Sequence, residues 1–407
     1  MQVLLIHYRK TMFKYKFEML FRSIFIEKLR TKTFCKGRTF CVVKRPSLPH
    51  NHTYEVIVSK SNNIFANLSL EEWLFENRDL SKKSVLLMWK NKPCVVIGRH
   101  QNPWLECNVS KAVTMSVDVV RRASGGGTVY HDEGNLNCSF ITDKCRYDRR
   151  RNLQFVIDAI ESRWDLDLEI NKRDDIILDK LYKVSGTASR LTRTKTYHHF
   201  TLLYRTDTDK LHKLLTSPFG TGVNSKATQS VSAQVRNMSD YATDMDFSSL
   251  VQVIGQHFHC GGLDQEFDQQ RFGEIQFVDP TDNEIFPGLH KLQSDLENWD
   301  WVYGKTPKFW LKKNYSTVLG RTEFTVSIAT EINKGKITQV DFTYLDTNHN
   351  DQMVNILANV RDIFIGQRFW IDDLEVLIHK LKGTVGSYGN KDLLNWILCC
   401  LKDTLHV

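Results

Sequence analysis

The sequence lacks the patterns that would give it a disulfide framework, a zinc site or a membrane span. Its nine cysteines are scattered over 407 residues and form no Cys-x-x-Cys pair, so we expect reduced thiols and no bound metal. No stretch approaches the roughly 18 consecutive apolar residues that a membrane-spanning helix requires. We therefore expect a soluble protein in a reducing compartment, with no membrane partner.

Acidic residues are almost absent from the first fifty positions. This segment contains 12 Lys or Arg and only two acids, Glu18 and Glu27, a balance of +10. Because the whole chain carries +8, the remainder sums to −2, and we expect no nucleic-acid partner. A basic, amphipathic and acid-poor start is typical of a mitochondrial transit peptide. We interpret residues 1–50 as a leader to the mitochondrial matrix, with a disordered basic arm as the alternative.

Beyond the leader, the hydrophobic pattern predicts short strands and a few helices. The predicted helices are 69–78, 153–164, 207–215, 248–258, 351–364 and 391–402. The predicted hairpins join 85–89 to 94–97, 176–178 to 181–185 and 324–329 to 337–344, with further strands at 136–140, 166–170 and 200–204. Ser69 and Glu72 have the spacing of a capping box. The pattern indicates an α+β fold with a mixed, largely antiparallel sheet, in two domains at 51–287 and 288–407.

Residues 121–140, which read RRASGGGTVYHDEGNLNCSF, contain three consecutive glycines. We call residues 124–127 the glycine loop. Without Cβ atoms, such a loop can bring its N–H groups close to an anion, so it is a candidate phosphate site. It leads into a strand, which excludes a P-loop and a dinucleotide fingerprint, because both open a helix. A mobile turn is the alternative, and the neighbouring arginines and histidine favour the phosphate site.

Lys183 lies on the second predicted hairpin, before a turn of small residues that reads VSGTAS. If it points into a cleft beside the glycine loop, its ammonium could neutralise a phosphate and the charge that develops on a carbonyl oxygen under attack. An exposed surface lysine is the alternative. His198 and His199 follow on a strand, where side chains alternate, so only one can face such a cleft. Neither has a metal-spaced partner.

Five segments together resemble the lipoate-protein ligase A family, and within it the mitochondrial lipoyltransferases of animals. They read GRHQNPW, RRASGGGTVYHDEGNLNCSF, KVSGTAS, HHFTLL and WDWVYGKTPKF, and the strong likeness spans about residues 62–310. The resemblance implies a biotin/lipoate-protein-ligase-like catalytic domain with a small accessory C-terminal domain. We separately expect a monomer. It also implies transfer of a lipoyl group from lipoyl-AMP to a lysine of lipoyl domains, in 2-oxoacid dehydrogenase E2 subunits and glycine cleavage H protein.

The resemblance also assigns roles to individual residues. Lys183 is similar to the catalytic lysine that contacts the lipoyl carbonyl and the adenylate phosphate. The residues implied to bind lipoyl-AMP are Trp89, Arg122, Ser124, Gly125, Gly126, Gly127, Tyr130, His131, Asn135, Arg173, Thr187, Ala188, His199, Thr201 and Thr228. A lipoyl tail needs an apolar tunnel, which Val95, Val96, Ile97 and Tyr130 could line. Arg99, Lys305 and Lys308 are candidates for steering an acidic lipoyl domain, with ordinary surface charge as the alternative.

Other activities of related families fit the sequence less well. An octanoyltransferase would need a cysteine where Thr196 and Tyr197 stand, and a biotin ligase would need a Gly-Arg-Gly-Arg loop. Ligases that activate lipoate with ATP carry Arg-Asn-Asp where this chain has Arg173, Asp174 and Asp175. Since an extra carboxylate repels a triphosphate unless Mg²⁺ bridges them, we expect preformed lipoyl-AMP as the donor. Mg²⁺ is possible but not required by transfer. A full ligase and a non-catalytic lipoyl-domain binder are the alternatives.

Overall fold

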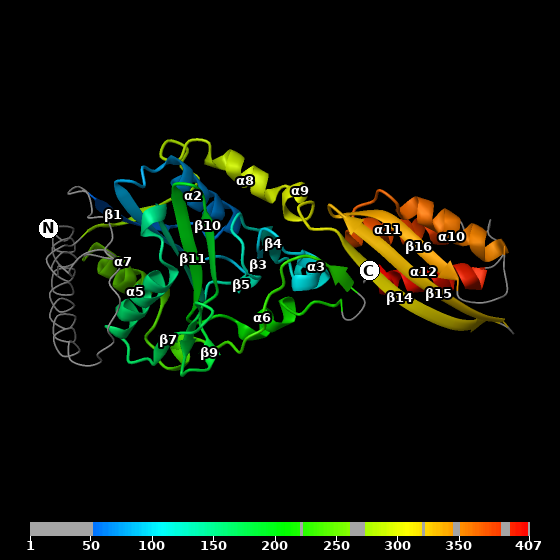
Figure 1. Cartoon of the computed structure of the whole chain (residues 1–407), viewed down its shortest axis with the longest axis horizontal. Coiled ribbons are helices and arrows are strands. Elements are labelled where there is room, and N and C mark those ends of the chain that lie inside the picture. The colour runs from blue at the N-terminus through cyan, green and yellow to red at the C-terminus, as the bar shows by residue number, and fades with distance from the viewer. Residues whose placement is uncertain are drawn as a thin grey trace, which may run out of the picture.

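The computed structural model describes residues 52–219, 223–260, 273–319, 322–344, 351–383 and 391–405. The predicted leader lies outside these residues. Figure 1 shows a larger unit built mainly from the first two thirds of the chain, and beside it a smaller unit of strands β14 to β16 and helices α10 to α12. Helices α8 (Leu289–Glu297) and α9 (Trp299–Val302) run along the first unit toward the second.

The first unit contains a six-stranded sheet in the order β10-β11-β6-β2-β1-β13. Its strands are β1 (Thr53–Ser59), β2 (Lys83–Trp89), β6 (Asn135–Asp143), β10 (Thr187–Leu191), β11 (Lys195–Leu203) and β13 (Ile275–Val278). β1 is parallel to β2 and β13, whereas β2, β6, β11 and β10 follow each other antiparallel. The predicted mixed, largely antiparallel sheet is confirmed.

Helices cover both faces of this sheet because side chains alternate along its strands. On β2, Leu86 and Met88 pack with α5 (Arg149–Glu161) and α7 (Phe247–His259), while Trp89 packs with α2 (Ile64–Asn77). The capping box predicted at Ser69 is wrong. Asn63 caps α2 by accepting from two backbone N–H groups, and Ser69 lies in the second turn, buried, donating to the Phe65 carbonyl.

A second layer holds the glycine loop. It is a three-stranded sheet in the order β4-β3-β5, formed by β3 (Cys94–Ile97), β4 (Asp118–Arg121) and β5 (Val129–His131), with α3 (Pro103–Glu106) and α4 (Val109–Thr114) between β3 and β4. The predicted hairpin of 85–89 with 94–97 is therefore wrong, since β2 and β3 belong to different sheets. The side chain of Asn91, which follows β2, is buried and forms hydrogen bonds with Asn67 on α2 and with His131 on β5. These bonds direct the chain after β2 into the second layer, so β3 does not pair with β2.

A third small sheet carries Lys183. It consists of β7 (Leu168–Ile170), β8 (Ile176–Leu178) and β9 (Tyr182–Lys183), and the antiparallel pairing of β8 with β9 confirms the predicted second hairpin. The backbone N–H of Lys183 donates to the Gln234 carbonyl at 2.8 Å. The lysine strand is therefore held between β8 and the polar segment after α6 (Thr208–Leu214).

The second unit is a sheet in the order β12-β14-β15-β16 covered by helices. Its elements are β12 (Val223–Ser225), β14 (Phe309–Leu319), β15 (Thr322–Asn333), β16 (Lys336–Tyr344), α10 (Asp351–Phe364), α11 (Ile371–Gly383) and α12 (Lys391–Leu405). The hairpin and the two helices predicted here are confirmed, whereas β12, β14 and α11 were not predicted. The domain boundary at residue 287 stays a prediction, and α8 packs on α2 of the first unit, next to the Trp73–Pro287 hydrogen bond.

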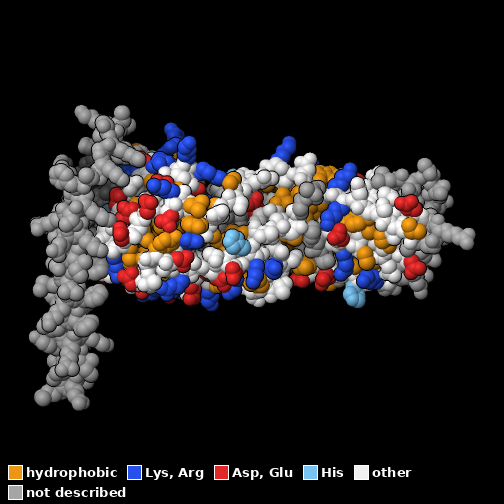
Figure 2. Space-filling view, turned by 90° about the horizontal axis from the view of Figure 1, so that it is seen from below, with side chains coloured by type: hydrophobic (Ala, Val, Ile, Leu, Met, Phe, Trp, Pro, Cys, Tyr) orange, Lys and Arg blue, Asp and Glu red, His pale blue; other side chains and the backbone are white. Residues whose placement is uncertain are grey.

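Three further observations concern the described part of the chain. Its seven cysteines form no disulfide with one another. No helix there combines the length and the apolar character needed to cross a membrane. On the face seen in Figure 2, basic and acidic side chains are interspersed over both units.

Candidate active site

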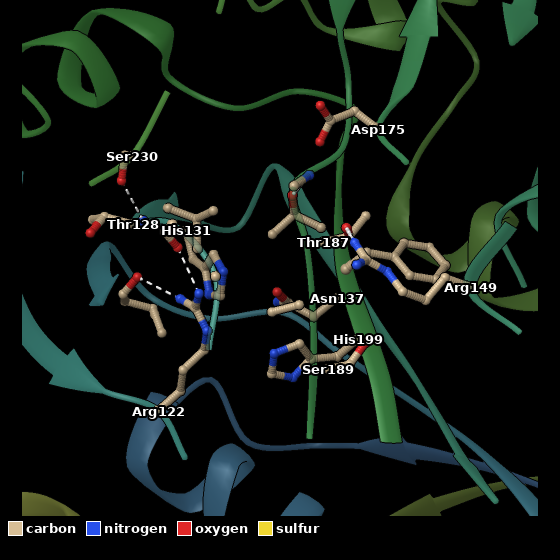
Figure 3. Close-up of a pocket in the computed structure, with 18 of the residues that line it drawn as sticks. Arg122, Thr128, His131, Asn137, Arg149, Asp175, Thr187, Ser189, His199 and Ser230 are labelled. Carbon is tan, nitrogen blue, oxygen red and sulfur yellow. Dashed lines mark hydrogen bonds between the residues drawn. The ribbon is translucent and has the colours of Figure 1, made fainter. Parts of the chain in front are cut away.

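A cavity of about 440 Å³ opens between the main sheet, the glycine loop and the hairpin of Lys183. Figure 3 shows Arg122 and Arg149 on opposite sides of this cavity, with Asn137 and His199 between them. The predicted site residues that line it are Lys183, Trp89, Arg122, Gly126, Gly127, His131, Arg173, Thr187, Ala188, His199 and Thr201. Segments far apart in the sequence therefore meet in one cavity.

A second cavity of about 630 Å³ adjoins the first. Its apolar side chains come mainly from α6 and from the segments around it, among them Leu203, Leu211, Leu215 and Phe219. Eight residues line both cavities: Thr128, Val129, Lys183, Gly186, Thr201, Gln229, Ser230 and Val231. Lys183 thus stands on a wall that the two cavities share.

The glycine loop is held by its carbonyl groups. The Arg122 guanidinium donates to the carbonyls of Gly125 and Gly127, both at 2.6 Å from Nη2, and to the Val96 carbonyl at 3.0 Å. Gly126 has φ +84°, and a Cβ there would lie 3.0 Å from Ala188 Cβ, so a side chain would be strained and crowded. Burial lowers the pKa of Arg122 to about 10, which leaves it charged at physiological pH.

Arg121 supports the backbone around the site and does not face a cavity. Its side chain is fully buried and lines neither cavity. It donates to the carbonyls of residues 98, 99 and 101, which precede α3, and to those of Trp301 and Val302 on α9. Of the two arginines that made the glycine loop a candidate anion site, only Arg122 faces the cavity.

Lys183 meets a carboxylate in the first cavity. Its Nζ lies 2.8 Å from Asp175 Oδ1, and the lysine side chain is 24% exposed while that of Asp175 is 10% exposed. The ammonium is therefore partly shielded from water but still reachable by a ligand. This geometry allows Lys183 to exchange Asp175 for an anionic ligand or to contact both.

His199 stands at the centre of a buried hydrogen-bond chain. Its Nδ1 lies 2.9 Å from a carboxylate oxygen of Glu71 on α2, and its Nε2 lies 2.8 Å from Ser124 Oγ. Arg122 Nε in turn donates to Ser124 Oγ at 3.0 Å. Because a carboxylate only accepts, the chain runs from Arg122 through Ser124 and His199 to Glu71. His198 faces the other side of β11 and bonds Asn152, as the alternation predicted.

A polar latch ties the segment 228–232 to the glycine loop. Ser230 Oγ accepts from the Thr128 N–H at 2.8 Å and from Gln101 Nε2 at 3.0 Å, and donates to Glu106. Gln101 Oε1 accepts from the Thr128 hydroxyl at 2.8 Å. Burial raises the pKa of Glu106. The latch places Gln229, Ser230 and Val231 over both cavities.

The position of Asp174 differs from the sequence-based expectation, which placed its carboxylate beside a bound triphosphate. Its carboxylate pairs with Arg150 at 3.1 Å and with Arg149 at 3.8 Å, and the residue lines neither cavity. Its φ of +60° is a conformation in which Asn and Asp are both enriched. Arg173 and Asp175, on either side of it, do line the first cavity.

The remaining predicted site residues lie around the two cavities. Tyr130 lines the second cavity, whereas Ser124, Gly125, Asn135 and Thr228 line neither. Ser124 and Gly125 bond Arg122, and the Asn135 amide bonds Asn137, which lines the first cavity. The Thr228 N–H donates to the His100 carbonyl at 3.3 Å, so Thr228 takes part in anchoring the latch segment.

The predicted apolar tunnel is only partly correct. Val96 lines the first cavity and Tyr130 the second, but Val95 and Ile97 point to the other face of β3, into a different core.

Sequence reasoning missed Glu71, Glu106, Arg149 and Ser230. Glu71 and Glu106 lie in helices and Arg149 in a basic run, so their sequence context suggested exposed charge.

Two of the residues named as candidates for steering a lipoyl domain have partners within the chain. Lys308 pairs with Glu331 at 3.1 Å and Arg99 lies over the Trp301 ring.

Comparison with known proteins bears on this site. Residues 63–259 match the lipoyl protein ligase A/B catalytic domain. The chain is 38% identical over 348 residues to lipoyl amidotransferase LIPT1, mitochondrial, of Homo sapiens, a match that covers 85% of this chain and 90% of that protein. It is 34% identical over 276 residues to lipoate-protein ligase A of Bdellovibrio bacteriovorus, covering 66% and 78%. The family resemblance noted in the sequence is confirmed.

Solved structures agree on the fold. P. falciparum LipL1, solved in complex with lipoate, superposes with a TM-score of 0.54 at 24% identity, covering 86% of this chain and 99% of that chain. A bipartite lipoate protein ligase from Thermoplasma acidophilum, described with its E2 lipoyl domain, has a TM-score of 0.50 at 18% identity, covering 62% and 96%. At such identities the likeness concerns the fold, and the predicted α+β class is confirmed.

The latch can be tested through Ser230. In Ser230→Ala, Glu106, Gln101 and the Thr128 N–H lose their shared partner, so the segment 228–232 should open more easily. We expect its amide hydrogens to exchange about tenfold faster, as the loss of the three hydrogen bonds of Ser230 Oγ implies. Hydrogen exchange followed by mass spectrometry measures this.

Ser232→Ala is the matched control, since Ser232 is an exposed serine of the same segment. It should exchange like the wild type. Equal exchange rates in Ser230→Ala, Ser232→Ala and the wild type would contradict the latch.

Proposed function

The chain belongs to the lipoyl protein ligase A/B family, and on that premise we propose that it is a lipoyltransferase that moves a lipoyl group from lipoyl-AMP to a protein lysine. Relatives named lipoyl amidotransferase and lipoate-protein ligase support lipoyl transfer as the reaction. The proposed acceptors are lipoyl domains of 2-oxoacid dehydrogenase E2 subunits and glycine cleavage H protein. The proposed location is the mitochondrial matrix, supported by the basic leader and by two relatives named mitochondrial.

The observation that carries the proposal is the position of Lys183 on the wall between two cavities. Lipoyl-AMP has two arms, an apolar acyl chain and an adenosine, joined through a carbonyl and a phosphate. The first cavity offers Leu68, Trp89 and Val96 to the acyl chain, and the second offers apolar side chains and backbone to the adenosine. The junction of the ligand then lies at Lys183.

Transfer from an acyl adenylate requires positioning more than activation. The acceptor amine attacks the acyl carbon, the carbon–oxygen bond to the phosphate breaks, and AMP leaves while the nitrogen loses a proton. The Lys183 ammonium donates to the oxyanion and to the departing phosphate, where negative charge increases. Arg122, Arg149 and Arg173 add further positive charge to the first cavity.

The source of the adenylate is a separate question. The sequence argument against ATP placed the carboxylate of Asp174 beside the triphosphate, but Arg149 and Arg150 hold that carboxylate outside both cavities. The proposal of preformed lipoyl-AMP therefore depends on the likeness to LIPT1 rather than on Asp174. ATP-dependent activation of lipoate is the second candidate, because Asp174 does not oppose it.

Supplying each donor separately distinguishes these candidates. We expect lipoyl-AMP to modify an apo lipoyl domain, with the mass increase of one lipoyl group, and lipoate plus ATP and Mg²⁺ to leave it unmodified. Intact-mass spectrometry of the acceptor is the readout. Lipoate-dependent exchange of ATP with pyrophosphate would instead assign the ligase reaction.

Lys183→Ala tests the proposed centre. Removing one donor to a developing oxyanion lowers the rate by roughly 10²- to 10³-fold, and we expect at least the lower value for transfer from lipoyl-AMP in single turnover. Lys172→Ala, at an exposed lysine near the same hairpin, should transfer within about twofold of the wild-type rate. Wild-type transfer by Lys183→Ala would remove the role assigned to this residue, and no transfer by the wild type would remove the proposed function.

A further inference from the structure

One side of the first cavity is not used by either arm of lipoyl-AMP in the proposed pose. The acyl chain was assigned to the apolar lining around Trp89, and the adenosine to the second cavity. Tyr147, Ser189 and Leu191 line the first cavity and not the second. Leu191 is 49% exposed, so this side of the cavity opens to solvent. It offers a third route to Lys183, which lines the same cavity.

This third route follows the outer edge of the main sheet. β10 is the first strand in the sheet order, and among the described residues it pairs only with β11. Ala188 is the partner of His199, which faces α2, whereas Ser189 accepts from the Tyr147 hydroxyl at 2.8 Å. Neighbouring side chains on a strand point to opposite faces. Since Ala188 and Ser189 both line the first cavity, the cavity passes along the free edge of β10.

Two segments beside this edge are strongly basic, and we call them the basic rim. Residues 143–151 contain five Lys or Arg and two Asp, and residues 187–195 contain three Lys or Arg and no acid, a combined balance of +6. Residues 51–407 as a whole sum to −2, so the rest of that stretch carries −8. The basic rim therefore stands out against an acidic remainder.

The two segments of the basic rim are neighbours in space. The Lys144 N–H donates to the Thr194 carbonyl at 2.8 Å, and the Arg149 guanidinium donates to Thr187 Oγ1 at 2.6 Å (Figure 3). Lys144 and Arg193 are exposed, and neither pairs with an acid among the described residues. Their charges can therefore meet an acidic partner without breaking an ion pair of the chain.

The basic rim also differs from the surface that the sequence suggested for steering an acceptor. Arg99, Lys305 and Lys308 line neither cavity. The basic rim, in contrast, supplies part of the wall of the first cavity, namely Tyr147, Arg149, Thr187, Ala188, Ser189 and Leu191. A protein docked on this rim would lie directly beside the opening.

The proposed reaction needs a lysine that is carried by a protein and reaches Lys183 while the donor is bound. An interface commonly combines apolar side chains with a polar rim, and here the exposed Leu191 lies among the basic residues. Positive charge steers and orients a partner of opposite charge. We propose that the acceptor protein docks on the basic rim through an acidic surface, and that its lysine enters the first cavity along the free edge of β10. This inference rests on the proposed function.

Reversing two charges of the basic rim tests the docking surface. Lys144→Glu/Arg193→Glu changes two exposed residues that line neither cavity. The full-length protein is saturated with lipoyl-AMP, the concentration of an apo lipoyl domain is varied, and intact-mass spectrometry gives kcat and KM. We expect kcat/KM for the acceptor to fall roughly tenfold through a higher KM, with kcat unchanged, because like charges then face each other.

Two further readouts separate docking from donor binding. The dissociation constant of lipoyl-AMP, measured by tryptophan fluorescence, should stay within about twofold of the wild-type value, because exposed charges outside the cavities contribute little to it. Added salt should lower kcat/KM for the acceptor in the wild type and lower it less in the double variant, because salt screens exposed charges.

Lys111→Glu is the matched control, since Lys111 is an exposed lysine on α4 that lines neither cavity. Its kcat/KM should stay within about twofold of the wild type. Should the double variant fail to fold, Arg193→Glu alone decides. An unchanged KM for the acceptor, or a loss of lipoyl-AMP binding that accounts for the slower transfer, would overturn this inference and leave the proposed function intact. A wild-type protein that transfers no lipoyl group would overturn both.

Discussion

Two adjacent buried arginines determine the shape of this site. Arg121 and Arg122 lie at the end of β4 and both donate mainly to backbone carbonyl groups. Arg121 ties α9 and the residues before α3 to the second layer, and Arg122 holds the glycine loop by the carbonyls of Gly125 and Gly127. A planar guanidinium carries five N–H groups in a fixed fork, against three on a lysine ammonium, so it can satisfy more carbonyls at once. These hydrogen bonds therefore hold the glycine loop in place at one side of the first cavity.

The role proposed for Lys183 depends on the elements that hold it opposite the glycine loop. Its strand is short, and on its own would be an exposed hairpin edge, but the Gln234 carbonyl and Asp175 fix its backbone and its ammonium. Opposite it, the chain from Arg122 to Glu71 connects the glycine loop to α2 through the core of the unit. The two cavities meet between these fixed points, at a wall that includes Lys183.

Much of the fold could be predicted from the sequence because its signals are local. Period-two alternation identified β6 and β7, apolar runs around a turn identified the hairpins of β8 and β15, and apolar stripes identified α5, α7, α10 and α12. The pairing of β2 with β3 failed because a short polar connection between two apolar runs predicts a hairpin, and only the buried amide of Asn91 shows that the chain changes sheets. The motif segments led to Lys183, Arg122 and His199. Glu71, Glu106 and Ser230 escaped prediction because their roles depend on partners more than 70 residues away in the chain or on burial, and neither is visible in a local pattern.

The central claim is that one ligand spans both cavities with its junction at Lys183. A crystal structure of the protein with a non-hydrolysable sulfamoyl analogue of lipoyl-AMP tests it most directly. We predict that the acyl chain lies along Trp89 in the first cavity and the adenosine lies in the second. Lys183 Nζ should then be within hydrogen-bond distance of both the carbonyl and the sulfamoyl oxygens. Adenosine in the first cavity, or a Lys183 that contacts only Asp175, would contradict the account.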